Sequence, residues 1–128
     1  MLAGHDRILS DAERAVLRLR WEELAEAMTE LDYQLAPTLM HGDAQHRNML
    51  WDEESYRHVL CDWESVAIGQ PEWDLVTVEI NCRRFGHPTH EYDDFCERYG
   101  FDIRRWSGYP LLCNLWGTSG HATIPTWR

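Results

Sequence analysis

The chain has 128 residues, of which 44% are hydrophobic and 27% are charged, a composition typical of one globular domain and not of a disordered or collagen-like chain. An excess of 22 acidic over 12 basic residues gives a formal net charge of -10, which argues against a nucleic-acid backbone as the main partner. No apolar run reaches the ~20 residues that a membrane helix needs, and the N-terminus lacks the basic and apolar regions of a signal peptide, so we expect a cytoplasmic protein with no membrane partner.

Two features of the composition limit the chemistry. All 12 basic residues are arginines, so no step that requires a lysine can take place within this chain. The cysteines are far apart and form no C-x-x-C motif, which favours reduced thiols over a disulfide framework or a zinc site. They are Cys61, Cys82, Cys96 and Cys113.

The first predicted element is a long helix. Ser10 and Glu13 have the S-x-x-E spacing of a capping box, which marks a helix start. The apolar residues that follow recur at alternating steps of four and three, as on one face of a helix that Pro37 would end. They are Leu17, Trp21, Leu24, Met28, Leu31 and Leu35. The stripe fits either a coiled-coil seam or a single helix that covers a globular core, and we favour the second.

Short strands are predicted next. The apolar runs 38–40 and 48–51 lie on either side of a polar loop, and residues 52–55 are typical of a turn. Residues 58–63 predict a strand that could pair back on 48–51 as a hairpin. The residues at 69–71 then break the chain.

Helices dominate the remainder of the prediction. Pro71 suits the first position of a helix that extends to Arg84. A second break at 86–88 precedes a shorter acidic helix over 89–99, which Gly100 would end.

The C-terminal part of the sequence divides after Leu112. A last helix is predicted to begin near Ile103 or Ser107 and to include Leu112. Residues 113–128 carry one formal charge and no helical stripe. We interpret them as an atypical tail, disordered or frameshifted, next to a domain of residues 1–112.

Three side chains between residues 43 and 62 supply the groups that phosphoryl transfer needs. Asp43 and Asn48 share a loop between predicted strands, and Asp62 arrives on the paired strand, so all three can point into one cleft. Asparagine and aspartate oxygens are hard ligands that suit Mg²⁺. With Asn48 and Asp62 on the metal, Asp43 is free to orient an attacking hydroxyl.

Three motifs carry a resemblance to a known family: H-G-D-x-x-x-x-N over 41–48, D-W-E over 62–64 and G-x-P-x-x-D-L over 69–75. The combination resembles the aminoglycoside phosphotransferase and choline-kinase-like family, which has a protein-kinase-like fold. The resemblance implies a mainly α fold with a small β-hairpin (α+β), corresponding to the C-terminal lobe of a kinase-like phosphotransferase. It also implies ATP-dependent phosphoryl transfer to a hydroxyl of a small molecule, such as an aminoglycoside, a choline-like compound or a sugar.

The resemblance also implies roles for single residues. Asp43 would be the base for the acceptor hydroxyl, while Asn48 and Asp62 would hold the Mg²⁺ that bridges the phosphates of ATP. His41 and Gly42 would shape the loop. Asp74 would brace that loop from the following helix, or would be only a first-turn acid favoured by the helix dipole.

The same family has an N-terminal lobe with a phosphate-covering loop and a lysine, which the residues before His41 do not match. We therefore expect little or no turnover from this chain alone. Three hypotheses stay open: an enzyme whose N-lobe comes from another chain, a non-catalytic pseudokinase-like binding module, and a non-functional truncated fragment.

Two further sets of polar residues have simpler interpretations. The histidines His41, His46 and His58 lack suitably spaced partners for a zinc site, so we expect ordinary polar histidines. The acidic residues Asp93, Asp94 and Glu97 could meet a cationic substrate, but we favour a solvated helix face.

Overall fold

The computed structural model describes residues 9–118. The chain divides into two compact units, residues 1–31 and residues 32–128. The predicted domain boundary after residue 112 stays a prediction. Among the described residues, no helix has both the length and the apolar character needed to cross a membrane.

The first unit contains helix α1 (Asp11–Thr29), and its start is confirmed. The backbone N–H of Glu13 donates to Ser10 Oγ at 3.2 Å, and the N–H of Ser10 donates to Glu13 Oε2 at 2.8 Å. These reciprocal bonds are the predicted capping box. Along the predicted stripe, Leu24 and Met28 are buried, whereas other members such as Trp21 are exposed.

The predicted extension of this helix to Leu35 is wrong, because α1 ends at Thr29. The backbone N–H groups of Gln34 and Leu35 both donate to Glu72 Oε1, each at 2.8 Å. In a continuing helix these donors would bond to the preceding turn. The distant carboxylate of Glu72 accepts these bonds instead. The helical spacing of apolar residues thus continues in the sequence beyond the residue at which the helix ends.

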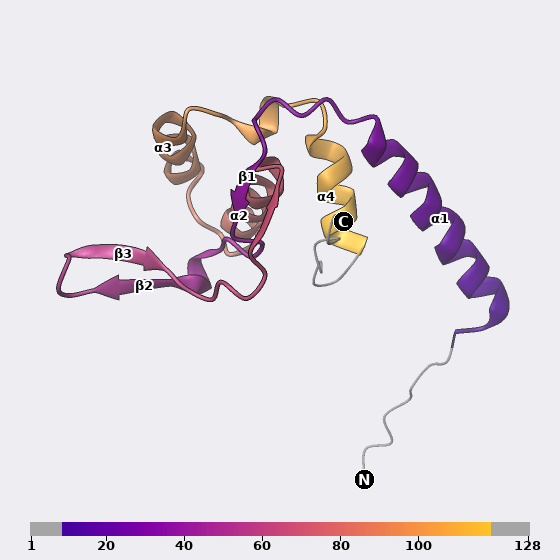
Figure 1. Cartoon of the computed structure of the whole chain (residues 1–128), viewed down its shortest axis with the longest axis horizontal. Helices are drawn as coiled ribbons and strands as arrows, with labels where there is room; N and C mark the ends of the chain where they lie inside the picture. Colours follow the sequence, from indigo (N-terminus) through magenta and orange to yellow (C-terminus); the bar gives the residue numbers. More distant parts are fainter. Residues whose placement is uncertain (1–8, 119–128) are drawn as a thin grey trace, which may run out of the picture. The chain divides into compact units, whose positions relative to one another are not determined.

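Two small antiparallel sheets carry the loops of interest (Figure 1). Strand β2 (Met49–Asp52) pairs with β3 (Arg57–Leu60), which confirms the predicted hairpin, although β3 ends before Cys61. Strand β1 (Thr38–Met40) pairs with β4 (Ala67–Gly69), a strand that the sequence analysis did not predict.

Helix α2 (Glu72–Arg84) is the centre of the second unit. It packs against α3 (Thr89–Tyr99), the short 3₁₀ helix η2 (Ile103–Arg105) and α4 (Tyr109–Thr118). Figure 1 shows α2 between α3 and α4. The core side chains are less than a tenth exposed, and burial of each stabilises the fold by about 1.5–3 kcal/mol. They include Met40, Trp73, Leu75, Val76, Ile80, Ile103 and Leu112.

Both helix predictions around the second break are confirmed, and Gly100 ends α3 with a φ of 88°. Helix α4 continues through Cys113 to Thr118 and buries Leu115, so the first part of the predicted tail is helical. Leu112 and Leu115 are three residues apart and so share a helix face. The remaining predicted tail, 119–128, lies outside the described residues.

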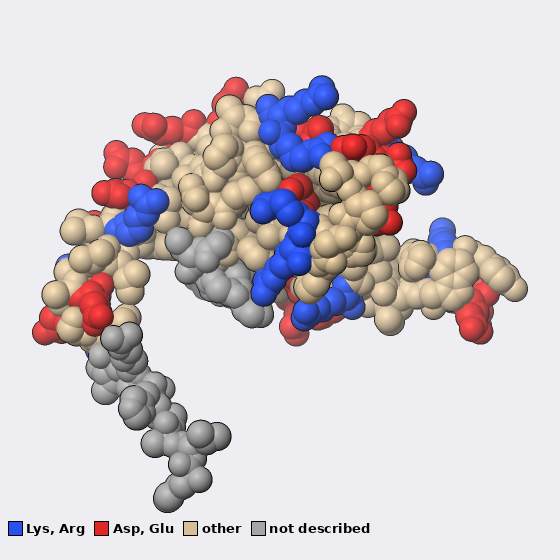
Figure 2. All heavy atoms as spheres, turned by 180° about the vertical axis from the view of Figure 1, so that it is seen from behind, with Lys and Arg blue, Asp and Glu red and all other residues tan. Residues whose placement is uncertain are grey.

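The architecture of the described residues agrees with the α+β prediction, since helices predominate and the strands form only two-stranded sheets. Arginine side chains lie beside Asp and Glu side chains on the face that Figure 2 draws. Among the described arginines, Arg83 and Arg104 form ion pairs with neighbouring carboxylates.

Candidate active site

The loop that follows β1 is held by the first turn of α2. The backbone N–H of His41 donates to Asp74 Oδ2 at 2.7 Å, and the N–H of Gly42 donates to Asp74 Oδ1 at 2.9 Å. One carboxylate therefore fixes two successive peptide groups. Such charge-assisted bonds are stronger than bonds between neutral groups.

Gly42 allows the loop to pass close to the segment after β3. Its φ of 88° lies in the left-handed region, which is unfavourable for residues that have a Cβ atom. A Cβ at this position would also collide with the backbone oxygen of Ser65. Only glycine meets both conditions without strain.

His41 links the loop to the end of the hairpin. It is only 3% exposed, and its Nε2 lies 2.7 Å from the carbonyl oxygen of Cys61. Its Nδ1 accepts from the backbone N–H of Asp43 at 3.1 Å. These partners assign the proton to Nε2, which makes the ring a neutral bridge between the two segments. The indole of Trp63 packs edge-on against it, with ring centroids 4.7 Å apart.

Asp43 and Asn48 contact each other directly. The amide nitrogen of Asn48 donates to the carbonyl oxygen of Asp43 at 2.8 Å and to its carboxylate Oδ2 at 3.0 Å. The other carboxylate oxygen, Oδ1, accepts from Gln45 Nε2 at 2.7 Å. The Asp43 carboxylate is thus oriented from both sides by neutral amides. Gln45 was missed in the sequence analysis, although its position in the loop is a local signal that could have suggested it.

Asn48 is the last residue of the 3₁₀ helix η1 (His46–Asn48). Its amide nitrogen is used by Asp43, while its Oδ1 receives no hydrogen bond from residues 9–118. This oxygen is therefore available as a ligand.

Asp62 follows β3 with a φ of 60°, a value uncommon for residues other than glycine, asparagine and aspartate. The backbone N–H of its neighbour Cys61 donates to the carbonyl oxygen of Asn48 at 2.6 Å. The chain thus brings Asp62 to the end of η1. Its side chain is exposed and forms no hydrogen bond or ion pair within the described part of the chain.

The donor set suits a hard divalent cation. No group of three or more His, Cys, Asp or Glu side chains among the described residues could hold a metal ion. Asn48 Oδ1 and the Asp62 carboxylate could supply two oxygen ligands. Mg²⁺ is commonly bound by one or two protein oxygens together with water and phosphate oxygens, so these residues fit it.

A model of the phosphotransferase enzyme family matches residues 2–109, which include the loop, Asp62 and Asp74. The chain belongs to the phosphotransferase enzyme family. This confirms the resemblance seen in the motifs. Searches of curated proteins and of solved structures found no match.

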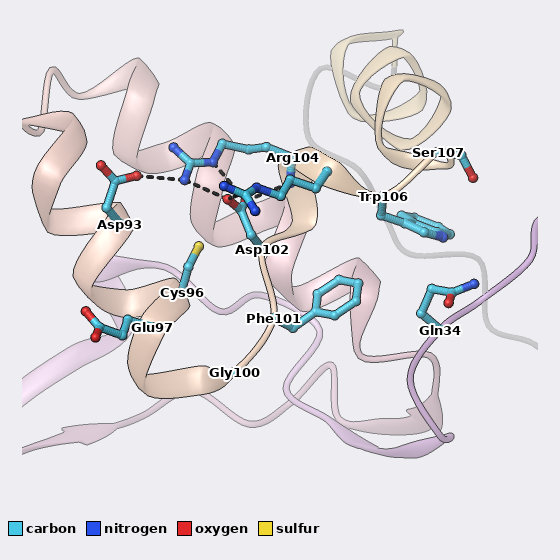
Figure 3. A pocket seen from close by; sticks show the side chains of 11 residues that line it. Gln34, Asp93, Cys96, Glu97, Gly100, Phe101, Asp102, Arg104, Trp106 and Ser107 are labelled. Atoms are coloured by element: carbon cyan, nitrogen blue, oxygen red, sulfur yellow. Dashed lines mark hydrogen bonds and ion pairs between the residues drawn. The ribbon is translucent and has the colours of Figure 1, made fainter.

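In this phosphotransferase-family chain, a pocket of about 990 Å³ lies where α3, η2 and the segment around Gln34 meet (Figure 3). Arg104 donates to Asp93 Oδ1 at 2.7 Å and to Asp102 Oδ1 at 2.8 Å. The hydrogen bond from Arg104 lowers the pKa of Asp102. None of residues 41–48 is among the described residues that line the pocket.

The acidic residues of α3 are exposed, as a solvated helix face would be. Asp93 and Glu97 line the pocket, and Asp93 is already paired with Arg104. Contact of these residues with a cationic substrate stays a prediction.

Two predicted polar histidines of the phosphotransferase-family chain contact other rings. His46 stacks on His87, with ring centroids 4.3 Å apart and an interplanar angle of 14°. Burial, and secondarily the charge of His87, lower the pKa of His46. His58 lies edge-on to Trp51 on the hairpin, with ring centroids 5.1 Å apart.

Proposed function

We propose that this protein transfers a phosphoryl group from ATP to a hydroxyl of a small molecule, with Asp43 as the base. The observation that carries the proposal is the pair of bonds from Asn48 Nδ2 to Asp43. This arrangement orients a carboxylate and frees an amide oxygen within one loop of a phosphotransferase-family chain.

The Asp43 carboxylate has unoccupied lone-pair sites that can accept the proton of the acceptor hydroxyl. Each oxygen of a carboxylate has two lone-pair sites, and Asp43 uses one on each oxygen for Gln45 and Asn48. A remaining site on either oxygen accepts the hydroxyl proton as the acceptor oxygen bonds to the γ-phosphorus of ATP. The bond from that phosphorus to the bridging oxygen breaks, and ADP leaves. A positioned base of this kind contributes about 10²–10⁴-fold to the rate.

Asn48 Oδ1 and Asp62 would hold Mg²⁺, which when bound neutralises charge on the phosphate groups. Asn48 then has two tasks, since its nitrogen orients the base and its oxygen is a metal ligand. His41, Gly42 and Asp74 keep the loop in place through the bonds described above.

The proposal includes partners and a location. Because the chain contains no lysine, a lysine that pairs with the nucleotide phosphates would come from another polypeptide segment, such as an N-lobe on a second chain. The acceptor is a hydroxyl-bearing small molecule of the aminoglycoside, choline-like or sugar type. The free cysteines support a reducing, cytoplasmic location.

The test is a phosphotransfer assay with ATP, Mg²⁺ and a panel of hydroxylated acceptors, run with the chain alone and with a candidate N-lobe partner. Asp43→Asn should lower kcat by at least about 10²-fold, because the amide cannot accept the proton. Glu53→Gln, an exposed change between β2 and β3, is the matched control. Equal rates for Asp43→Asn and the unsubstituted protein would rule out the assigned base.

A further inference from the structure

We infer that the turn from α2 to α3 positions Asn48 through two ring contacts, with Phe85 and His87 as positioning residues. The inference rests on the proposed function, because it concerns the same loop. It adds that the two ends of helix α2 hold the two ends of the candidate catalytic loop.

The helical turn η1 has little support of its own. It has three residues, and Gln45 at its N-cap makes no side-chain capping bond. The N–H of Asn48 donates to the carbonyl oxygen of Gln45 at 3.0 Å, which is the i→i+3 pattern of a 3₁₀ turn. Asn48 itself is held by the bond from the Cys61 N–H and by its own bonds to Asp43, so the remaining support of η1 has to come through His46 and Arg47.

Both of these residues contact the α2–α3 turn. The His46 ring stacks on His87, and the Arg47 guanidinium carbon lies 5.0 Å from the centroid of the Phe85 ring. The segment that links α2 to α3 thus passes beside the residues that precede β2 (Figure 1).

The turn is a firm support because backbone bonds fix it to α2. The N–H groups of Phe85, Gly86 and His87 donate to carbonyl oxygens of the last turn of α2 at 3.0, 3.3 and 2.9 Å. His87 Nδ1 also lies 3.3 Å from Glu91 Oε2. Helix α2 is itself buried in the core, so the turn cannot move without it.

Helix α2 consequently contacts the loop twice. Asp74 in its first turn holds residues 41–42, and the two rings beyond its last turn hold residues 46–47. Asp43 lies between these anchors. The bonds from Asn48 to Asp43 form only if both ends of the loop keep their places, so loss of the rings should loosen Asn48.

The test uses the whole chain with Phe85→Leu, His87→Ala and the double variant. Phe85 is 46% exposed, so the fold should survive, which a thermal melt checks. The first readout needs no metal: hydrogen exchange of the Asn48 side-chain amide, followed by NMR, should become at least about threefold faster in the double variant. The second is calorimetric titration with Mg²⁺ alone, in which Kd should rise about 10-fold, as for other residues that orient metal ligands.

Matched variants separate positioning from general destabilisation. His87→Phe and Phe85→Tyr keep the rings and should restore slow exchange, whereas His90→Ala, an exposed change on α3, should change neither readout. Unaltered Asn48 exchange in a folded double variant would overturn the inference. If Asn48 exchange responds but the unsubstituted chain binds no Mg²⁺, the positioning role stands and the proposed metal site fails.

Discussion

Backbone geometry at single residues shapes the candidate site. Gly42 and Asp62 both have positive φ values, at the two segments that His41 joins. The first needs glycine because a side chain would meet Ser65, whereas the second carries an aspartate whose side chain has no polar partner among residues 9–118. Left-handed backbone at a residue other than glycine often marks a functional position.

Substitution of Gly42 should lower the free energy of unfolding more than substitution of another glycine that has a similar positive φ. Gly42→Ala adds strain from φ and a collision with Ser65, and we expect a loss of about 2 kcal/mol or more in the free energy of unfolding. Gly86→Ala is the control, because Gly86 has a φ of 70° but nothing within 4 Å of its Cβ position. Urea unfolding measures both. Equal losses of unfolding free energy in Gly42→Ala and Gly86→Ala would show that the close approach of Gly42 to Ser65 does not contribute to the cost.

At the scale of elements, helix ends and short turns carry the interactions that hold the loops. The turn η2 is an example, since Asp102 accepts from both the backbone and the side chain of Arg104. The hydrogen bonds and charge of Arg104 keep the pKa of Asp102 below its usual value of 3.8.

This pKa shift predicts an acid-sensitive contribution to stability. Because the folded-state pKa is lowered, the ionised form stabilises the fold above about pH 3.8, and the contribution disappears as the pH falls through the lower folded-state value. Asp102→Asn should therefore lose less stability between pH 7 and about pH 2 than the unsubstituted chain. Thermal unfolding at both pH values measures the difference, and parallel pH profiles would contradict the prediction.

Helix α4 gives a second test at this scale. Leu115 is 6% exposed and lies beyond the boundary at residue 112 that the sequence suggested. If α4 is an integral part of the second unit, Leu115→Ala should lower the free energy of unfolding by about 2–5 kcal/mol. Leu17→Ala, at a 55% exposed leucine of α1, should have little effect. A cost for Leu115→Ala as small as that of Leu17→Ala would show that α4 does not pack as described.

For the whole molecule, family membership and site geometry lead to the same interpretation. The matched range, residues 2–109, contains each of the candidate site residues. In the structure, Asp74 and His41 hold the loop, Asn48 orients Asp43, and Asp62 follows the strand that ends beside η1.

Ligand linkage tests this interpretation on the intact chain. A ligand that binds only the folded state stabilises it, by about 2.7 kcal/mol at 100 times its Kd. Mg²⁺ should raise the unfolding midpoint of the unsubstituted chain, and Asp62→Asn should reduce the increase because it removes a charged oxygen ligand. Glu64→Gln, an exposed change nearby, is the control. An equal increase in Asp62→Asn would exclude Asp62 as a ligand.

The sequence by itself determined the local structure and the identity of the candidate residues. The capping box at Ser10, the hairpin around 49–60 and the end of α3 at Gly100 depend on residues a few positions apart, whose preferences act without tertiary help. The motif spacing likewise indicated the family, which the family match confirmed.

Tertiary structure alone decided where α1 ends, which strand pairs with β1, and what supports η1. Glu72 takes the amides of residues 34–35, β4 pairs with β1 across the whole hairpin, and His87 reaches His46. Each of these contacts joins residues about 30 to 40 positions apart. Such residues come into contact only when the core packs. The apolar periodicity of a short stretch of sequence therefore does not predict these contacts.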